Sequence, residues 1–176
     1  MKMDVRPDAA GAADDLGGEL RLALRRLAKA VGVIAAKHKG QRFAMTATAL
    51  SELALDPPSM LICVNQSASM HPALDEGADF SINILHRSQT PIAARCSGAE
   101  KGEARFSIGD WGETEAGIPY LKTSQASIIC KNDARLAYGT HSVFIGCVKQ
   151  VFSTGEVNPL VYADGNYTFL KEIGIG

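Results

Sequence analysis

Short apolar runs bounded by turn residues recur along this chain and predict mainly β structure. Runs of apolar or alternating residues that end at Gly, Pro, Asn or Asp are typical of half-buried strands. Two such runs flank a short turn at residues 39–41, which predicts antiparallel pairing, and residues 164–166 form the hairpin-turn sequence Asp-Gly-Asn. The expected strands cover residues 31–38, 42–50, 60–64, 80–85, 124–135, 138–153, 160–162 and 167–170. Because closure removes unpaired edges, six or more strands with few helices favour a closed or nearly closed antiparallel barrel.

Helical periodicity is confined to three segments. Residues 19–29 place leucine and alanine at helical spacing, with arginine and lysine elsewhere around the helix. Shorter helices are expected over about residues 72–76 and 89–96. Between residues 101 and 120 the periodicity fades, and Gly, Pro, Trp111 and charged residues predict a long ordered loop.

The length and composition of the chain suit one globular domain. It has 176 residues, 46% of them hydrophobic, which is enough for a substantial core. Residues 1–18 are rich in Ala, Gly and Asp and lack an apolar core, so they are interpreted as a flexible N-terminal arm. A single domain is then expected over residues 19–176.

The charge balance excludes several classes of partner. With 18 basic and 19 acidic residues, the formal net charge of −1 creates no overall field that favours nucleic acid or an anionic membrane. No apolar run reaches the roughly 18–20 residues that cross a bilayer. We therefore expect no nucleic-acid partner, no membrane partner and a cytoplasmic location.

The cysteine and histidine residues form no metal-binding motif. Structural zinc sites use closely spaced ligand pairs, and the chain has neither a CxxC nor an HExxH pattern. Free and mostly buried thiols are expected, because Cys packs as a small hydrophobe in a reducing compartment. The residues concerned are Cys63, Cys96, Cys130 and Cys147, and the histidines at positions 38, 71, 86 and 141. No metal cofactor is predicted.

The most informative stretch is residues 44–58, followed after a short apolar run by the polar cluster at 65–69. It is expected to form a strand end and a loop pinned by two prolines. Thr46, Thr48 and Ser51 supply hydroxyl groups among small side chains, which leave the backbone open to a flat ligand. The residue types alone favour the simpler interpretation, a Ser/Thr-lined turn between two strands whose hydroxyls make only local hydrogen bonds.

Several segments together resemble one known family. In chain order they are Met45-Thr46-Ala47, Leu55-Asp56-Pro57-Pro58, Cys63-Val64-Asn65, Phe80-Ser81-Ile82-Asn83-Ile84-Leu85, Gln89 with Ile92-Ala93, Gly139-Thr140-His141 with Gly146 and Val148, and Pro159-Leu160-Val161-Tyr162 with Gly165 and Tyr167. In this order, over about residues 30–170, they resemble the short-chain flavin reductases. These are the reductase components of two-component flavin-dependent monooxygenases, such as those that act on 4-hydroxyphenylacetate.

The resemblance implies a fold, a reaction and a set of site residues. The fold is a split β-barrel of the FMN-binding type, antiparallel and Greek-key-like, in a homodimer. The reaction is hydride transfer from NADH or NADPH to FMN or FAD, with reduced flavin passed to a partner oxygenase. The segment from Thr46 to Leu53 would hold the isoalloxazine, the segment from Asn65 to Ser69 the ribityl and phosphate oxygens, and His141 would lie beside the nicotinamide as the catalytic residue. The candidate cofactor-binding residues are Thr46, Ala47, Thr48, Ala49, Ser51, Leu53, Asn65, Gln66, Ser67, Ser69 and Asn83.

The chain departs from the family pattern at several of these positions. The usual Thr-Ala-Asn-Ser becomes Thr-Ala-Thr-Ala, so Ala49 has no side-chain hydrogen bond to offer. Glu52 and Ala54 stand where serine is common, and Cys96 stands where an aromatic residue is common. The usual Gly-Asp-His is Gly-Thr-His here, because Thr140 replaces the carboxylate beside the histidine.

Other functions remain open at this stage. The chain could keep its flavin and reduce another acceptor such as a corrinoid, bind flavin without turnover, or serve as a β-barrel interaction module. His141 could be a structural residue of a strand start, and Ser67 and Ser69 could cap the helix near residue 72. Tyr162 and Tyr167 are expected mainly to pack the last hairpin, although one of them could border the flavin pocket.

Overall fold

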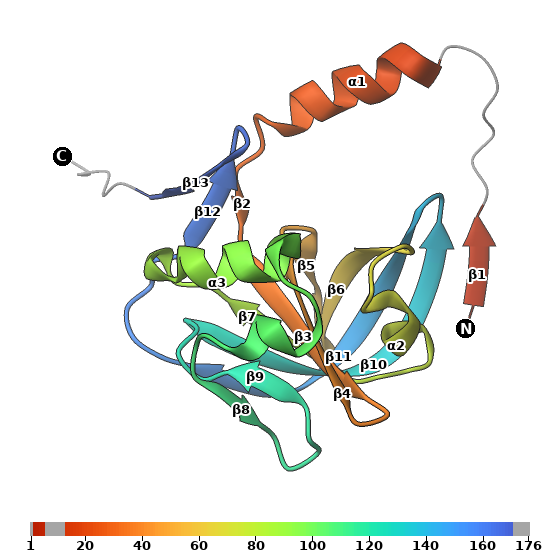
Figure 1. Ribbon diagram of the computed structural model, residues 1–176. Coiled ribbons are helices and arrows are strands. Elements are labelled where there is room, and N and C mark those ends of the chain that lie inside the picture. The colour runs from red at the N-terminus through yellow and green to blue at the C-terminus, as the bar shows by residue number, and fades with distance from the viewer. Residues whose placement is uncertain (1, 6–12, 171–176) are drawn as a thin grey trace.

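The computed structural model describes residues 2–5 and 13–170 and is built mainly from β-strands (Figure 1). The main sheet runs in the order β4 (Gln41–Ala47), β3 (Gly32–His38), β7 (Phe80–Ile84), β10 (Ala126–Tyr138), β11 (His141–Ser153), β6 (Pro58–Asn65) and β5 (Leu50–Leu55), with β1 (Lys2–Val5) parallel to β10. Two small sheets comprise β2 (Lys29–Ala30), β12 (Leu160–Ala163) and β13 (Asn166–Phe169), and β8 (Trp111–Glu113) with β9 (Pro119–Leu121). Apart from β1, all the pairings are antiparallel, as predicted.

The helices are short and lie around the sheet. They are α1 (Ala13–Leu24), α2 (His71–Asp75), α3 (Thr90–Ala94), the 3-10 turns η1 (Arg87–Gln89) and η3 (Gly102–Phe106), and the π-helical turn η2 (Arg95–Ala99). Figure 1 shows α1 apart from the main sheet, joined to it through β2 and lying above the barrel. None of the described helices is long and apolar enough to span a membrane.

The main sheet is a split barrel and not a closed one. Its path of paired strands ends at β4 on one side and β5 on the other. These two strands follow each other in sequence, separated by Thr48 and Ala49, and the backbone crosses from one to the other at this point. Full closure is therefore wrong, whereas the split barrel and the mainly β class are confirmed. The break places an approachable piece of backbone at the rim of the barrel.

Turn chemistry explains the hairpins that the sequence predicted correctly. At the turn between β3 and β4, Lys39 and Gly40 both have positive φ, 49° and 79°. Asp164 and Gly165 do the same between β12 and β13, with φ of 50° and 80°. Two successive positive φ values suit the right-handed twist of the flanking strands.

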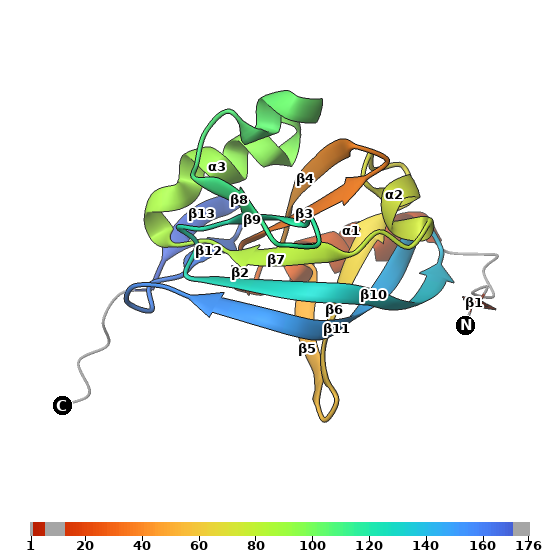
Figure 2. The same ribbon diagram turned by 90° about the horizontal axis from the view of Figure 1, so that it is seen from below.

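Three predictions about elements need correction. Helix α1 begins at Ala13, six residues earlier than expected, so the predicted domain boundary at residue 18 falls within it. It also ends at Leu24, five residues earlier than expected, and Lys29 belongs to β2. The loop expected between residues 50 and 60 is a β-hairpin, β5–β6, which projects from the body of the molecule (Figure 2). The long loop predicted at 101–120 contains η3, β8 and part of β9. Residues 6–12 of the predicted arm lie outside the described residues.

Two apolar clusters cover the two faces of the sheet. One packs α2 against the barrel interior around Ile34, Phe80 and Phe144. The other packs α3 and η3 against β3 and β4, around Val33 and Leu121. The barrel interior is packed tightly enough around β11 to require a glycine at position 146. The two clusters hold β4 from both sides and so fix the strand that leads to the rim.

One tryptophan and two cysteine side chains pack in or against these clusters. Trp111 packs edge-on against Phe106, with ring centroids 4.8 Å apart, and its Nε1 donates to the Ile108 carbonyl at 2.8 Å. It is half-buried and packs against the second cluster. All four cysteines are free thiols, and Cys96 and Cys130 are buried. Burial raises the pKa of Cys96 to about 11 and that of Cys130 to about 12.

Candidate functional site

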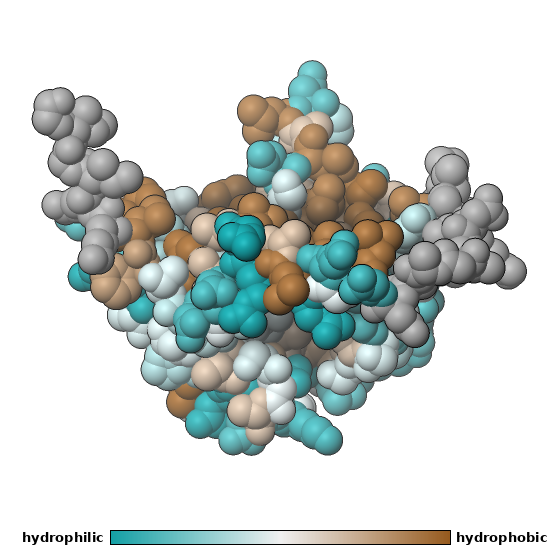
Figure 3. Space-filling view, turned by 90° about the horizontal axis from the view of Figure 1, so that it is seen from above, coloured by the Kyte–Doolittle hydropathy of each residue, from teal (hydrophilic) through white to brown (hydrophobic). Residues whose placement is uncertain are grey.

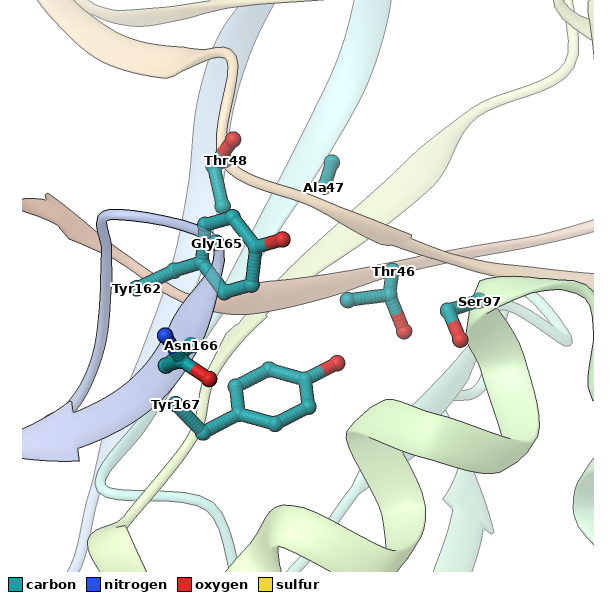
Figure 4. Close-up of a pocket in the computed structure, with 8 residues that line it drawn as sticks. All are labelled: Thr46, Ala47, Thr48, Ser97, Tyr162, Gly165, Asn166 and Tyr167. Carbon is teal, nitrogen blue, oxygen red and sulfur yellow. The ribbon is translucent and has the colours of Figure 1, made fainter. Parts of the chain in front are cut away.

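A cavity of about 440 Å³ opens where β4 passes into β5 (Figure 4). Its walls come from three separate parts of the chain: the end of β4, the turn η2 and the β12–β13 hairpin. The lining residues are Thr46, Ala47, Thr48, Ser97, Tyr162, Gly165, Asn166 and Tyr167. The first three belong to the segment that the sequence predicted, and the other five do not.

The wall formed by β4 is made of small side chains and exposed backbone. Thr46 does not present a free hydroxyl, because its Oγ1 donates to the Ala93 carbonyl at 2.6 Å and ties β4 to α3. Thr48 is half-buried at the rim and Ala49 is exposed. A flat ligand can therefore approach the backbone closely here, whereas Thr46 contributes mainly its methyl group.

The opposite wall is aromatic. Tyr162 and Tyr167 pack edge to face, with ring centroids 5.5 Å apart and an interplanar angle of 68°. In Figure 4 the Tyr167 hydroxyl points across the cavity toward Thr46 and Ser97. Burial raises the pKa of Tyr167, with the neighbouring Tyr162 adding to the effect, so the phenol stays a neutral donor at physiological pH. The two tyrosines pack the last hairpin as predicted, and they also form the cavity wall.

A second cavity, of about 420 Å³, shares Thr48 with the first. It runs along the outer face of the β5–β6 hairpin, and Ala49, Ser51 and Cys63 are among its lining residues. Ser51 is half-buried there, and its Oγ donates to the Glu52 carbonyl at 3.0 Å. The predicted segment is thus split between two neighbouring cavities. Leu53 lines neither of them and is 47% exposed on the projecting hairpin.

The loop Asn65–Ser69 is organised by its own side chains. Asn65 Oδ1 accepts from the Ser67 backbone N–H at 2.9 Å and from its hydroxyl at 2.8 Å, which forms an Asx turn. Gln66 Nε2 donates to the carbonyls of Gly139 and His141, at 3.4 Å and 3.3 Å. These contacts fix the loop against the β10–β11 turn and occupy the Ser67 hydroxyl.

Ser69 differs from Ser67 in its surroundings. It lines a cavity of about 270 Å³ together with the basic residues Arg42, Lys101 and Arg105. Arg105 is anchored by donating from Nε to the Glu100 carbonyl at 2.8 Å and from Nη1 to the Ala44 carbonyl at 2.5 Å. The capping alternative is wrong for both serines, because the N-cap residue of α2 is Met70 and no side-chain cap bond is present.

Arg42 has a counter-charge in this basic cavity. It forms an ion pair with Glu103, and its guanidinium also lies 4.2 Å from the centroid of the Phe106 ring. Within the described residues, Lys101 has no acidic partner at salt-bridge distance. Among the residues that the structure describes, Lys101 and the anchored Arg105 are therefore the cations of this cavity that are not already paired with a carboxylate and can attract an anion.

His141 is the first residue of β11 and is exposed. It pairs across the strands with Asn65, two residues beyond Cys63 of the second cavity. Its Nδ1 lies 2.9 Å from the Thr140 hydroxyl oxygen. The structure thus brings His141 beside the predicted phosphate loop, but not into the cavity of Thr46 and Tyr167. Its catalytic role stays a prediction.

Asn83 is a candidate that the structure buries completely in the core. It is fully buried on β7, where Nδ2 donates to the Val33 carbonyl and to Ser81 Oγ, both at 2.9 Å. Its Oδ1 accepts from the Leu121 backbone and from Ser127 Oγ, both at 2.8 Å. All its bonding capacity serves to link strands, so Asn83 is a structural residue and is withdrawn from the candidate site.

Sequence reasoning missed the residues that reach the site from distant segments. Ser97 gave no signal, and Gly165 and Asn166 were assigned only to a hairpin turn. The tyrosine pair was assigned mainly to hairpin packing, with a place beside the flavin pocket left open for one of the two. The available signal was the two aromatic residues on one face of a short terminal hairpin. Among residues 2–5 and 13–170, no group of three or more His, Cys, Asp or Glu side chains could hold a metal ion.

Comparisons with known proteins agree with this architecture. A family model described as a flavin reductase like domain matches residues 24–171. The reductase component of an FADH2-dependent resorcinol hydroxylase from Rhizobium sp. strain MTP-10005 is 34% identical over 166 residues, which cover 93% of either chain. An FMN reductase (NADH), RutF 1 of Methylorubrum extorquens strain PA1, is 31% identical over 150 residues, 85% of this chain and 74% of that protein.

A solved structure extends the similarity to three dimensions. Flavin reductase PheA2 in its native state superposes with a TM-score of 0.80 at 27% identity, covering 92% of this chain and all of that one. The fold and its relatives define the class, a split-barrel flavin oxidoreductase. The chain belongs to the flavin-reductase-like domain family. Its membership confirms the family resemblance, the fold class and the expectation of an enzyme.

Proposed function

We propose that this protein reduces FMN or FAD with NADH or NADPH and passes the reduced flavin to a partner monooxygenase. The observation that carries the proposal is the cavity at the split of the barrel, with small residues on one wall and Tyr167 on the other. Support for the partner comes from the resorcinol hydroxylase reductase component, which is similar over nearly its whole length. Support for the nucleotides comes from the relative named an NADH-dependent FMN reductase.

The flavin ring would bind between β4 and the β12–β13 hairpin. Bound flavin supplies the hydride-accepting chemistry, and the protein supplies position and surroundings. The backbone around Ala47 and Thr48 would face one edge of the ring system. Tyr167 would cover an apolar face and keep its hydroxyl as a neutral donor. This arrangement fits a ligand that is flat, aromatic and rimmed by hydrogen-bonding groups.

The flavin phosphate would bind in the basic cavity beside Ser69. Arg42 and Thr46 are four residues apart on β4, which corresponds to about 14 Å at the usual rise of a strand. The same strand therefore connects the proposed ring site with the proposed phosphate site. Lys101 and Arg105 supply positive charge, and the Ser69 hydroxyl supplies a hydrogen bond. Ser67, whose hydroxyl donates to Asn65 in the Asx turn, would have a structural role.

The nicotinamide would approach from the side of Thr48 and the second cavity. His141 is proposed to contact it from the start of β11, beside the end of β6, in a positioning and electrostatic role, because the flavin and the nicotinamide would themselves carry the hydride chemistry. Thr140 would hold the imidazole in one orientation through its hydroxyl. With a hydroxyl in place of a carboxylate, this pairing adds no negative charge beside the nucleotide.

A homodimer is also part of the proposal. Leu16 and Leu20 of α1 are 66% and 57% exposed, and Leu55 at the tip of the β5–β6 hairpin is 89% exposed. Figure 3 shows apolar surface gathered on the side of α1 and on the projecting hairpin. Large exposed apolar patches on soluble proteins mark interaction sites, and two-fold dimers are the commonest solution. We also propose that the protein works in the cytoplasm.

Steady-state kinetics test the proposed function directly. Oxidation of NADH and of NADPH is measured with FMN, FAD and riboflavin each in turn, and we expect turnover that requires added flavin. Flavin used as a substrate is expected to be lost from the purified protein on dialysis. Retained flavin together with reduction of a different acceptor would contradict the proposal. If neither NADH nor NADPH is oxidised with any of the three flavins, the protein would instead be one that binds flavin without turnover.

A further inference from the structure

A third cavity, of about 360 Å³, lies between the C-terminal end of α1, the linker to β2 and the β12–β13 turn. It meets the flavin cavity at Thr48, Tyr162 and Gly165, which line both. Two of its lining residues, Arg21 and Leu22, precede the start of the matched family segment at residue 24. The cavity is therefore continuous with the proposed flavin site.

The charges around this cavity are unbalanced. Arg21, Arg25 and Lys29 line it, against a single carboxylate from Asp164. Arg25 is already engaged, because its Nε donates to Asp164 Oδ1 at 2.8 Å and its Nη2 to the Asp164 carbonyl at 3.3 Å. In the part of the chain that the structure describes, Arg21 and Lys29 have no acidic partner at salt-bridge distance. An excess of two positive charges thus remains at the mouth of the cavity.

The remaining wall is apolar and aromatic. Leu24 and Leu27 are 45% and 53% exposed, and Tyr162 is 37% exposed where it separates this cavity from the flavin cavity. An apolar surface beside two cations matches a ligand with a flat heterocycle and a polyphosphate. The pair Arg25–Asp164, together with the Asp164 N–H donating to the Arg25 carbonyl at 2.8 Å, fixes the linker against the hairpin. The cavity is therefore held in shape before a ligand arrives.

We propose that this cavity binds the adenosine diphosphate half of the nicotinamide dinucleotide, with Arg21 and Lys29 on the phosphates and Leu24, Leu27 and Tyr162 around the adenine. The assignment rests on the proposed function. FAD carries the same adenosine diphosphate group. The flavin phosphate, however, is assigned to the opposite end of β4, beside Ser69 and Lys101, whereas this cavity opens at Thr48 on the nicotinamide side. The electron donor is therefore the occupant that the geometry selects.

Calorimetric binding of ADP to the full chain tests the site without turnover. The double variant Arg21→Ala/Lys29→Ala is compared with Arg26→Ala, which removes a neighbouring charge that does not line the cavity. Loss of two charge-assisted contacts is expected to raise the Kd for ADP by about tenfold or more, and Arg26→Ala to leave it nearly unchanged. Equal ADP affinity in all three proteins, or no ADP binding by the unmodified chain, would overturn the proposal.

Kinetics then separate the donor from the flavin. In the double variant, the KM for NADH should rise several-fold, while the KM for reduced nicotinamide mononucleotide, which lacks the adenosine half, should not change. A weakened affinity for FAD relative to FMN, with an unchanged KM for NADH, would overturn the assignment to the donor. A shift of the sedimentation coefficient in the double variant would identify this surface as a subunit contact instead. If no flavin is reduced by either donor, the proposed function fails, and the ADP titration still decides the site.

Discussion

The Thr140 hydroxyl oxygen lies 2.9 Å from Nδ1 of His141 at the turn between β10 and β11. The pair is exposed, and the His141 backbone carbonyl accepts from Gln66 of the predicted phosphate loop. The histidine is therefore held in place by a neutral side-chain neighbour and by the loop. A hydroxyl can orient an imidazole by a hydrogen bond, but it does not favour the charged form as a carboxylate does.

His141→Ala should affect the nicotinamide step and spare flavin binding. If the imidazole contacts the nicotinamide in ground and transition states alike, its loss should appear mainly as a higher KM for NADH. A contact made only in the transition state should lower kcat, by roughly tenfold for each 1.4 kcal/mol lost. Flavin affinity, measured by fluorescence titration, serves as the control. Wild-type kinetics in this variant would reduce His141 to a structural residue.

Thr140→Asp should restore a carboxylate beside the same histidine. Because a carboxylate favours the charged imidazole, the KM for NADH should depend more steeply on pH between about pH 5 and pH 8 than in the unmodified protein. Thr140→Ala is the matched control and should not add that dependence. Identical pH profiles for all three proteins would show that His141 protonation does not matter to the nucleotide.

The two serines of the phosphate loop are expected to behave differently. Ser69→Ala should weaken FMN binding, and Lys101→Ala should weaken it more, by about tenfold, because a charge-assisted bond to phosphate is lost. Riboflavin has no phosphate, so its affinity should hardly change. Ser67→Ala is the internal comparison, since that hydroxyl is already bonded to Asn65. An equal effect of the substitutions on FMN and riboflavin would place the phosphate elsewhere.

The sequence predicted those parts of the fold that depend on local chemistry. The β3–β4 hairpin was correct because Lys39-Gly40 can adopt the backbone that such a turn needs. The start of α1 was misjudged because this helix is held by little packing and its leucines are exposed, so burial does not mark its ends. The β5–β6 hairpin was predicted to be a loop because prolines usually interrupt a strand. In the structure Pro58 is the first residue of β6, a position at which a strand tolerates proline.

The candidate site was predicted only where it is contiguous in sequence. Thr46 to Thr48 line the cavity as expected, because consecutive residues at the end of one strand reach the same part of the rim. Tyr167 reaches the same cavity from about 120 residues away, a proximity set by the barrel that no local pattern reveals. Asn83 was misassigned because a polar residue in a strand can bind a ligand or stabilise the core, and the sequence does not distinguish the two. In the structure its side chain makes four hydrogen bonds within the core.

The barrel interior predicts a strong effect at Gly146. A Cβ built on this residue would lie 2.6 Å from Phe80 Cζ and 2.6 Å from Cys130 Cβ. Gly146→Ala should therefore lower the free energy of unfolding by about 1–3 kcal/mol through overpacking. Gly17→Ala in α1 meets nothing within 4 Å and is the control, expected to be neutral or to stabilise by up to about 1 kcal/mol. Chemical denaturation of both variants measures the difference.

His71 gives the protein a predicted sensitivity to acid. The side chain is buried, its Nε2 lies 2.9 Å from Ser142 Oγ, and burial, with the Arg135 charge adding to it, lowers its pKa below the usual 6.5. The unfolded chain therefore binds a proton more readily than the folded one. Stability is fully present above about pH 6.5 and is lost as pH falls from there through the folded pKa. Denaturation midpoints measured from pH 7.5 downward should show this loss, and His71→Gln should flatten it.

The exposed leucines predict how the proposed homodimer can be broken. Leu20 lies on the outer stripe of α1 and Leu55 at the tip of the β5–β6 hairpin, and neither packs in the two clusters of the core. If a two-fold partner covers them, Leu20→Glu or Leu55→Glu should put a charge into an apolar contact and shift sedimentation toward monomer at micromolar concentration. Arg26→Glu is the matched control, because it changes a charge just after the end of α1 without removing apolar area. An unmodified protein that sediments only as a monomer would contradict the dimer, and a dimer unaffected by either leucine substitution would place its interface elsewhere.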